Sequence, residues 1–176
     1  RRLLNKIMGK KIIVTGGSRG IGKAIAEAFL KNGDEVLVVA RKPNELEVIQ
    51  KEFSQFGQIY TVQADVSEEV AVKNVADTTR GLWGEVDVLV NSAGIYGAIG
   101  TVTDVNPVEW KKALEINLFG TFLMARAIAH LMKEQKNGVI INFAGGGEGP
   151  FPNFTSYVAS KGGVLRFTET VAEELK

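Results

Sequence analysis

The chain has 176 residues, 45% hydrophobic and 23% charged, which is an ordinary balance for one globular domain with a real core. The formal net charge of +1 gives no overall attraction to nucleic acid or to an anionic membrane, and no apolar run approaches the ~20 residues of a membrane span. The absence of cysteine excludes disulfides and thiolate chemistry and fits a reducing compartment, so a cytoplasmic protein is predicted.

The first nine residues are basic and contain no acid. They lack a long apolar region and an evident cleavage site, so they are interpreted as an extension ahead of a start near Met8 rather than as a targeting segment. No repeat, low-complexity tract or linker follows. Residues 1–176 are therefore predicted to form a single domain, with 1–9 as a basic N-terminal extension.

Short apolar runs alternate with segments of helical periodicity along the rest of the chain. Such runs are typical of strands buried on both faces. Strands are predicted at residues 11–14, 35–40, 58–63, 86–90 and 139–143, and helices at 21–31, 46–53, from 67, at 106–135 and from 156. Ser67 and Asn106 are predicted to cap the starts of their helices. The alternation predicts an α/β fold with a doubly wound parallel sheet.

A glycine-rich segment, Thr15-Gly16-Gly17-Ser18-Arg19-Gly20-Ile21-Gly22, joins the first strand to the first helix. Glycines at 16, 20 and 22 let the backbone approach a phosphate, and the helix amino terminus offers free N–H groups and a partial positive charge. Their spacing is wider than the usual G-x-G-x-x-G. The segment predicts a nucleotide site, with a tight turn that binds nothing as the alternative.

Arg41 directly follows the second strand, where doubly wound folds commonly hold an acid that binds a ribose. Neither Ala40 nor Arg41 offers a carboxylate. Arg41 and Arg19 can instead hold a 2′-phosphate with bidentate donors, which favours NADP over NAD. The alternative is that both arginines are solvated surface residues.

Two further strand ends carry polar or small residues. Asp65 and Val66 follow the third strand, and Asn91-Ser92-Ala93-Gly94 follows the fourth. The carboxyl ends of such strands form the ligand crevice. Asp65 is therefore predicted to accept a hydrogen bond from an adenine amino group, and Asn91 and Gly94 to bring the loop close to a ribose.

Tyr157 and Lys161 lie four residues apart near the start of the last helix, so they share one face. A nearby cation favours phenolate and lowers a pKa that is ~10 when unperturbed, as proton exchange near neutral pH requires. Asn117 falls within a helical stripe predicted to face inward, marked by Trp110, Leu114, Leu118 and Phe122. Its amide either ties two elements together or holds a water beside Lys161.

The motifs Thr15-Gly-x-x-x-Gly-Ile-Gly, Asn91-x-Ala-Gly, Asn117 and Tyr157-x-x-x-Lys161, in this order, resemble short-form members of the short-chain dehydrogenase/reductase family. The resemblance covers about residues 10–176. Within the family, the chain is similar to the 3-oxoacyl-carrier-protein reductases. It implies a Rossmann-type sheet with strand order 3-2-1-4-5. It also implies that Tyr157 is the general acid/base, that Lys161 lowers its pKa and binds the nicotinamide ribose, and that Asn117 holds a proton-relay water.

The activity that follows is the NADP-dependent interconversion of a carbonyl and a secondary alcohol. We expect a small-molecule substrate, no nucleic-acid, membrane or metal partner, and a homodimer or homotetramer built on the last two long helices. Predicted cofactor-binding residues are Gly16, Ser18, Arg19, Gly20, Ile21, Gly22, Arg41, Asp65, Val66, Asn91, Ala93, Gly94, Tyr157 and Lys161.

Two departures from the family pattern leave other functions open. Family members normally carry a serine where this chain has Ala144, followed by Gly145, Gly146 and Gly147. Asn142 or Ser156 is a candidate replacement donor. The family also continues through two more strands and a substrate-covering region, so truncation and an open edge beside the fifth strand are expected. Both departures favour an alternative, an NADP(H)-binding protein with little turnover; a sugar-nucleotide epimerase is less favoured because its glycine loop is normally shorter.

Overall fold

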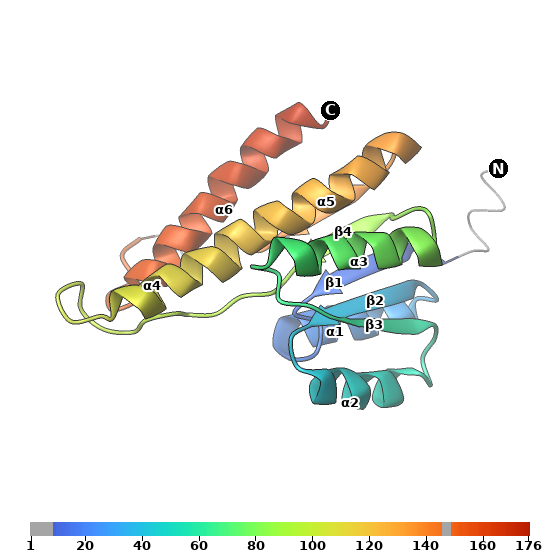
Figure 1. The fold of residues 1–176 in the computed structure, drawn as a ribbon, viewed down its shortest axis with the longest axis horizontal. Coiled ribbons are helices and arrows are strands. Elements are labelled where there is room, and N and C mark those ends of the chain that lie inside the picture. Colours follow the sequence, from blue (N-terminus) through green and yellow to red (C-terminus); the bar gives the residue numbers. More distant parts are fainter. Residues whose placement is uncertain (1–8, 146–148) are drawn as a thin grey trace.

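The computed structural model describes residues 9–145 and 149–176. The predicted N-terminal extension lies outside the described residues, apart from Gly9. So do Gly146 and Gly147, two of the three glycines that follow Ala144. A parallel sheet of five strands in the order β3-β2-β1-β4-β5 forms the centre of the molecule (Figure 1), which confirms the predicted topology. The strands are β1 (Lys11–Thr15), β2 (Glu35–Ala40), β3 (Ile59–Gln63), β4 (Val88–Asn91) and β5 (Val139–Asn142).

Helices cover both faces of this sheet (Figure 1). They are α1 (Gly20–Lys31), α2 (Pro43–Phe53), α3 (Glu69–Leu82), α4 (Pro107–Leu114), the π-helical turn η2 (Glu115–Phe119), α5 (Gly120–Gln135) and α6 (Thr155–Glu174). The side chains of each central strand alternate between two cores. Ile12 and Val14 pack in a core with residues of α1 and α2, whereas Ile13 packs with residues of α3 and α5.

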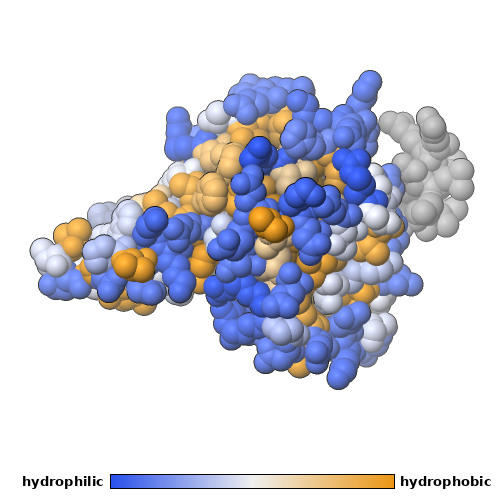
Figure 2. Space-filling model, in the orientation of Figure 1, coloured by the Kyte–Doolittle hydropathy of each residue, from blue (hydrophilic) through white to orange (hydrophobic). Residues whose placement is uncertain are grey.

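The fifth strand lies at one edge of the sheet, as expected. Val139 is 54% exposed and Ile141 41% exposed, although both pair with β4 residues that are buried. The connection between β4 and α4 extends away from the sheet (Figure 1), and its surface mixes hydrophobic and hydrophilic residues (Figure 2). None of the described helices is long and apolar enough to cross a membrane.

Three local predictions need correction. Ser67 does not cap α3, because its hydroxyl and backbone N–H both donate to the Asp65 carboxylate. The long helix predicted to end at Gln135 does end there, but a π turn at Glu115–Phe119 interrupts it. This turn shifts the inward face, so Phe122 is 36% exposed while Ala113 and Asn117 are fully buried.

Asn106 caps α4 as predicted, accepting from the N–H groups of Val108 and Glu109.

Candidate functional site

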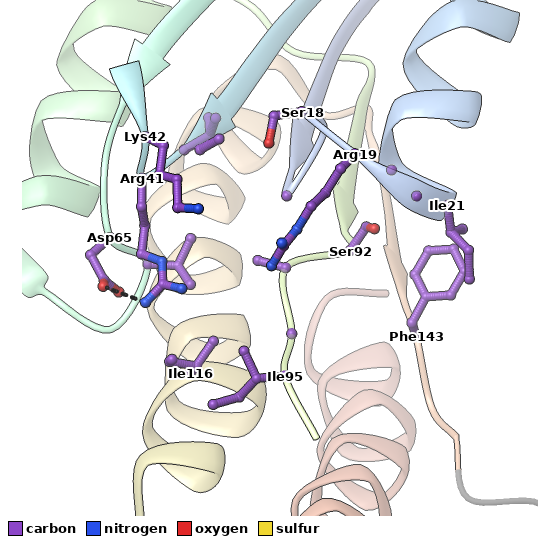
Figure 3. Close-up of a pocket in the computed structure, with 18 of the residues that line it drawn as sticks. Ser18, Arg19, Ile21, Arg41, Lys42, Asp65, Ser92, Ile95, Ile116 and Phe143 are labelled. Carbon is purple, nitrogen blue, oxygen red and sulfur yellow. Dashed lines mark ion pairs between the residues drawn. The ribbon is translucent and has the colours of Figure 1, made fainter. Parts of the chain in front are cut away.

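A cavity of about 470 Å³ opens at the carboxyl ends of the strands (Figure 3). Its volume lies in the range of small-ligand sites. The structure brings together at this cavity almost all of the residues predicted to bind a cofactor. Those that line it are Gly16, Ser18, Arg19, Gly20, Ile21, Gly22, Arg41, Asp65, Val66, Ala93, Gly94, Tyr157 and Lys161.

The glycine turn is packed on one side and open on the other. A Cβ on Gly22 would lie 2.5 Å from the Gly16 carbonyl oxygen, and a Cβ on Gly16 would lie 2.8 Å from the Ala93 Cα. Gly20 has φ +56, and a Cβ there would meet nothing within 4 Å. Helix α1 begins at Gly20 without a side-chain cap. Its first N–H groups are therefore free to receive an anion.

Two arginines reach the cavity from different elements (Figure 3). Arg19 comes from the glycine turn, and Arg41 follows β2 and pairs with Asp65, its Nη1 lying 3.5 Å from Oδ2. Burial alone would raise the pKa of Asp65, but the hydrogen bonds from Ser67 and the charge of Arg41 outweigh it, so this pKa is lowered. Asp65 is thus an ionised acceptor beside an arginine.

Lys42 and Glu45 also line the cavity and were not predicted as site residues. The Ser18 hydroxyl donates to Glu45 Oε2 at 2.8 Å, and Lys42 Nζ lies 3.2 Å from Oε1. The hydrogen bond from Ser18, followed by that from Lys42, lowers the pKa of Glu45. The cavity rim therefore holds three cations and two carboxylates. The one sequence signal for Lys42 was its position next to Arg41.

Tyr157 and Lys161 project from the first turns of α6 into this same cavity. Lys161 Nζ donates to the Phe143 carbonyl oxygen at 2.7 Å and lies 5.9 Å from the centre of the Tyr157 ring. The side chains thus share one site, as the i, i+4 spacing predicted.

The predicted electrostatic effect of Lys161 on Tyr157 is not seen. Burial, with a smaller contribution from Tyr96, raises the pKa of the Tyr157 phenol above 10.0, and burial lowers the pKa of Lys161 below 10.5. An ammonium–phenolate pair would shift both pKa values in the opposite directions. The prediction of a lowered phenol pKa is therefore wrong, because loss of water dominates and the ammonium is bonded to a backbone carbonyl.

Asn117 is fully buried and holds the segment after β4. Its Oδ1 accepts from the Ile95 N–H at 2.8 Å, and its Nδ2 donates to the Ile95 carbonyl and to the Ser160 hydroxyl. It does not line the cavity, but a Cβ on Gly94 would lie 3.2 Å from Asn117 Oδ1 and 3.8 Å from Lys161 Nζ. The amide ties two elements together beside the lysine, which was one of its two expected roles.

Asn91 lies away from the cavity lining, in contrast to the prediction. It is buried, and its amide donates to Asn142 Oδ1 at 2.9 Å. Asn142 in turn donates to the Thr168 hydroxyl. This chain of bonds joins β4, β5 and α6. Asn142 is therefore engaged on the helix side of the sheet and is not directed at Tyr157.

The position of the family serine has no hydroxyl. A Cβ on Gly145 would lie 2.7 Å from the Tyr157 hydroxyl, so this glycine occupies the place beside the phenol. Ser156, the other candidate replacement, is fully buried and donates to the carbonyl oxygens of Tyr96 and Ala98. Neither candidate donor is therefore directed at the Tyr157 oxygen.

Aromatic residues gather beside Tyr157. The ring centres of Tyr96 and Tyr157 are 5.0 Å apart, and Tyr96 also contacts Phe154 at 5.5 Å. Phe154 stacks on Phe151 at 4.4 Å. Sequence reasoning missed Tyr96, because its only signal was a position two residues after Gly94. No group of acids and histidines that could hold a metal occurs in residues 9–145 and 149–176.

The sheet order, the glycine turn and the cavity at the strand ends define a Rossmann-type protein of the doubly wound class. A family model described as short chain dehydrogenase matches residues 10–176, so the chain belongs to the short-chain dehydrogenase family.

Curated relatives and solved structures agree with this family. The chain is 36% identical over 173 residues to glucose 1-dehydrogenase 2 of Bacillus subtilis (strain 168), covering 94% of this chain and 66% of that protein. It is 36% identical over 175 residues to the short chain dehydrogenase tazN of Aspergillus terreus, covering 95% of this chain and 38% of that protein. The chain thus spans less than two thirds of the length of these relatives.

Among solved structures, an NAD+-bound xylitol dehydrogenase superposes with a TM-score of 0.92 at 32% identity, covering 97% of this chain and 66% of that chain. A metagenomic short-chain oxidoreductase in complex with NADP superposes with a TM-score of 0.89 at 34% identity, covering 96% and 77%. The cofactors of these two neighbours differ. The closer similarity to 3-oxoacyl-carrier-protein reductases stays a prediction.

Proposed function

We propose that this protein is an NADP-dependent oxidoreductase that interconverts a carbonyl compound and a secondary alcohol, with Tyr157 as the general acid/base. The observation that carries the proposal is the presence of Tyr157 and Lys161 in the same cavity as the glycine turn. One end of that cavity suits phosphates, and the other offers a proton donor beside an amine.

The donor set of the cavity fits a nicotinamide dinucleotide. The open face of Gly20 and the uncapped start of α1 suit the pyrophosphate, and Asp65 suits the adenine amino group. Arg19, Arg41 and Lys42 suit a 2′-phosphate, which supports NADP rather than NAD. When bound, the dinucleotide would supply or accept the hydride.

The residues of this chain supply the rest of the chemistry. In reduction the carbonyl oxygen gains negative charge, and Tyr157 gives it a proton. A phenol whose pKa lies at or above its ordinary value is protonated at neutral pH, as a general acid must be. Lys161 is held by the Phe143 carbonyl and suits ribose hydroxyl groups as a donor. Asn117 fixes the backbone at Ile95 and keeps the site floor in place.

The test is a set of tyrosine variants. Tyr157→Phe keeps the ring and removes the proton, so NADPH oxidation with a ketone or aldehyde should fall by at least ~10²-fold while NADPH affinity is retained. Tyr60→Phe is the matched control, because Tyr60 lies on β3 and does not line the cavity. Turnover of Tyr157→Phe at the rate of the unchanged protein would refute the assignment.

A second candidate function is NADP(H) binding with little or no turnover. The lack of a hydroxyl at Ala144 and Gly145 favours it, since one preorganised donor is worth ~10²–10³ in turnover. Protein that binds NADPH yet oxidises none across a broad panel of ketones and aldehydes would establish this alternative. The same panel distinguishes the two candidates.

We also propose a homodimer or homotetramer. Phe119 and Phe122 are 45% and 36% exposed, and Phe122 contacts Phe167 of α6, so an aromatic patch lies across η2, α5 and α6. Such a patch supports association. Val164, also on α6, is buried and does not belong to this patch. Sedimentation equilibrium tests the assembly: a monomer at all concentrations would contradict it. The cytoplasmic location stays a prediction.

A further inference from the structure

Tyr96 is a second phenol in the cavity that holds Tyr157. Its ring is tilted by 52° to the Tyr157 ring, with centres 5.0 Å apart. Tyr96 is 58% exposed and lines the cavity. The other hydroxyl-bearing residues of the lining are Ser18 in the glycine turn, Ser92 after β4 and Tyr157 itself. Among these, Tyr96 is the residue whose ring packs against the Tyr157 ring.

The backbone of Tyr96 is fixed from both sides. Before it, Asn117 binds both the N–H and the carbonyl of Ile95 at 2.8 Å. Its own carbonyl accepts from the Ser156 hydroxyl at 3.3 Å, and Ser156 is the residue before Tyr157. After it, Gly97 has φ +73, and a Cβ there would lie 2.5 Å from the Ala113 Cβ. The ring is thus held on a rigid base, and a preorganised donor does not have to be ordered during the reaction.

The positions at which family members carry a serine offer no hydroxyl in this chain, because they are Ala144 and Gly145. A Cβ on Gly145 would lie 2.7 Å from the Tyr157 hydroxyl, so a side chain there would press on the phenol. Asn142 and Ser156 are both engaged elsewhere. A substrate oxygen at Tyr157 would therefore receive one hydrogen bond from α6 and would need another from a different element. Tyr96 lies on a different element, the segment after β4, and carries a phenol that can donate such a bond.

We propose that Tyr96 is a second catalytic residue that donates a hydrogen bond to the substrate oxygen beside Tyr157. This role rests on the proposed function. In carbonyl reduction a reduced nicotinamide dinucleotide would give up the electron pair of one C–H bond as hydride to the carbonyl carbon and become oxidised. The π electrons of the C=O bond would move to the oxygen, and that oxygen would take the proton of Tyr157, which is left as phenolate until solvent reprotonates it. Tyr96 keeps its own proton and stabilises the negative charge that develops on the oxygen.

The electrostatics of the site agree with a close pair of phenols. After burial, proximity to Tyr96 is the other cause that raises the pKa of Tyr157. Two phenols that share one site do not both ionise readily, since like charges disfavour each other. The direction of this shift agrees with the 5.0 Å distance between the two ring centres.

The three tyrosines of the chain give a matched set of variants. Tyr96→Phe should lower kcat for NADPH-dependent ketone or aldehyde reduction by ~10²–10³, with little change in KM or in NADPH affinity. Tyr60→Phe should leave kcat unchanged, because Tyr60 lies outside the cavity. A kcat for Tyr96→Phe equal to that of the unchanged protein would overturn the proposal, as would a rise in KM alone, which indicates an aromatic wall.

A second readout does not depend on turnover. Tyr60→Phe/Tyr96→Phe leaves Tyr157 as the sole tyrosine of the chain, so ultraviolet difference absorbance follows its ionisation directly. Tyr60→Phe alone keeps two tyrosines and should show two ionisation midpoints. The single midpoint of the double variant should lie at lower pH than the higher of those two. Equal midpoints would show that the phenols are not neighbours and would overturn the proposal. If the unchanged protein reduces no carbonyl in the panel, the proposed function itself fails. If the unchanged protein reduces a carbonyl and Tyr96→Phe has the same kcat, only the role of Tyr96 fails.

Discussion

Replacing Arg41 by alanine should separate the binding of NADPH from that of NADH. Arg41 follows β2, and its guanidinium reaches the cavity while pairing with Asp65 at 3.5 Å. A hydrogen bond to a charged group contributes ~1.5–3 kcal/mol. The Arg41 side chain is 45% exposed and already shares its charge with Asp65, so the lower part of that range applies, about 1.5–2 kcal/mol. This corresponds to a rise in the NADPH Kd of about 10- to 30-fold.

The assay is a fluorescence titration of NADPH and of NADH at low and at moderate ionic strength. NADH lacks the 2′-phosphate, so its Kd should change little in Arg41→Ala, and added salt should narrow the difference between the two cofactors. Arg126→Ala is the control, because this guanidinium pairs with Glu69 outside the cavity. An equal loss of NADPH and NADH affinity, or no loss of either, would refute a phosphate-binding role for Arg41.

Three further outcomes test the site. Asn117→Ala removes the hydrogen-bond partners of Ile95 and should lower the free energy of unfolding by about 2–4 kcal/mol. The cap variant Asn106→Ala should lower it by about 1 kcal/mol. Equal losses of the two variants in urea denaturation would contradict the role of Asn117 in joining two elements. Gly22→Ala places a Cβ 2.5 Å from the Gly16 carbonyl oxygen, so urea denaturation should show a loss of about 1–3 kcal/mol, and titration should show weaker NADPH binding. Because the pKa of Tyr157 is raised above its ordinary value, the rate of carbonyl reduction should stay constant across neutral pH and the rate of alcohol oxidation should rise with pH. A rate of reduction that declines as the pH rises through the neutral range would contradict this direction.

The fold could be predicted because its main determinants are local. Continuous apolar runs such as Val36–Val39 become strands covered on both faces, and segments with helical spacing become the covers. The site followed from the same topology, since the carboxyl ends of parallel strands meet at one edge. Residues within two positions of the ends of β1, β2 and β3, such as Gly16, Arg41 and Asp65, therefore line one cavity although they are far apart in sequence.

Residues that act through tertiary packing could not be predicted in this way. The π turn at Glu115–Phe119 moves the buried face of the long helix, and nothing in the spacing of Leu114, Leu118 and Phe122 indicates that turn. Tyr96 reaches Tyr157 through a loop whose path depends on Asn117 and on Ser156. Loop paths of this kind are set by distant partners rather than by periodicity.

The direction of the pKa shifts is the clearest case where the structure adds to the sequence. The spacing of Tyr157 and Lys161 predicts a favourable charge pair, but spacing carries no information about burial. In this site loss of water raises the pKa of the phenol and lowers that of the amine, and the amine donates to the Phe143 carbonyl. The protonated phenol is the form that a proton donor in carbonyl reduction requires. Oxidation needs the phenolate and therefore needs added positive charge in the cavity or a higher pH.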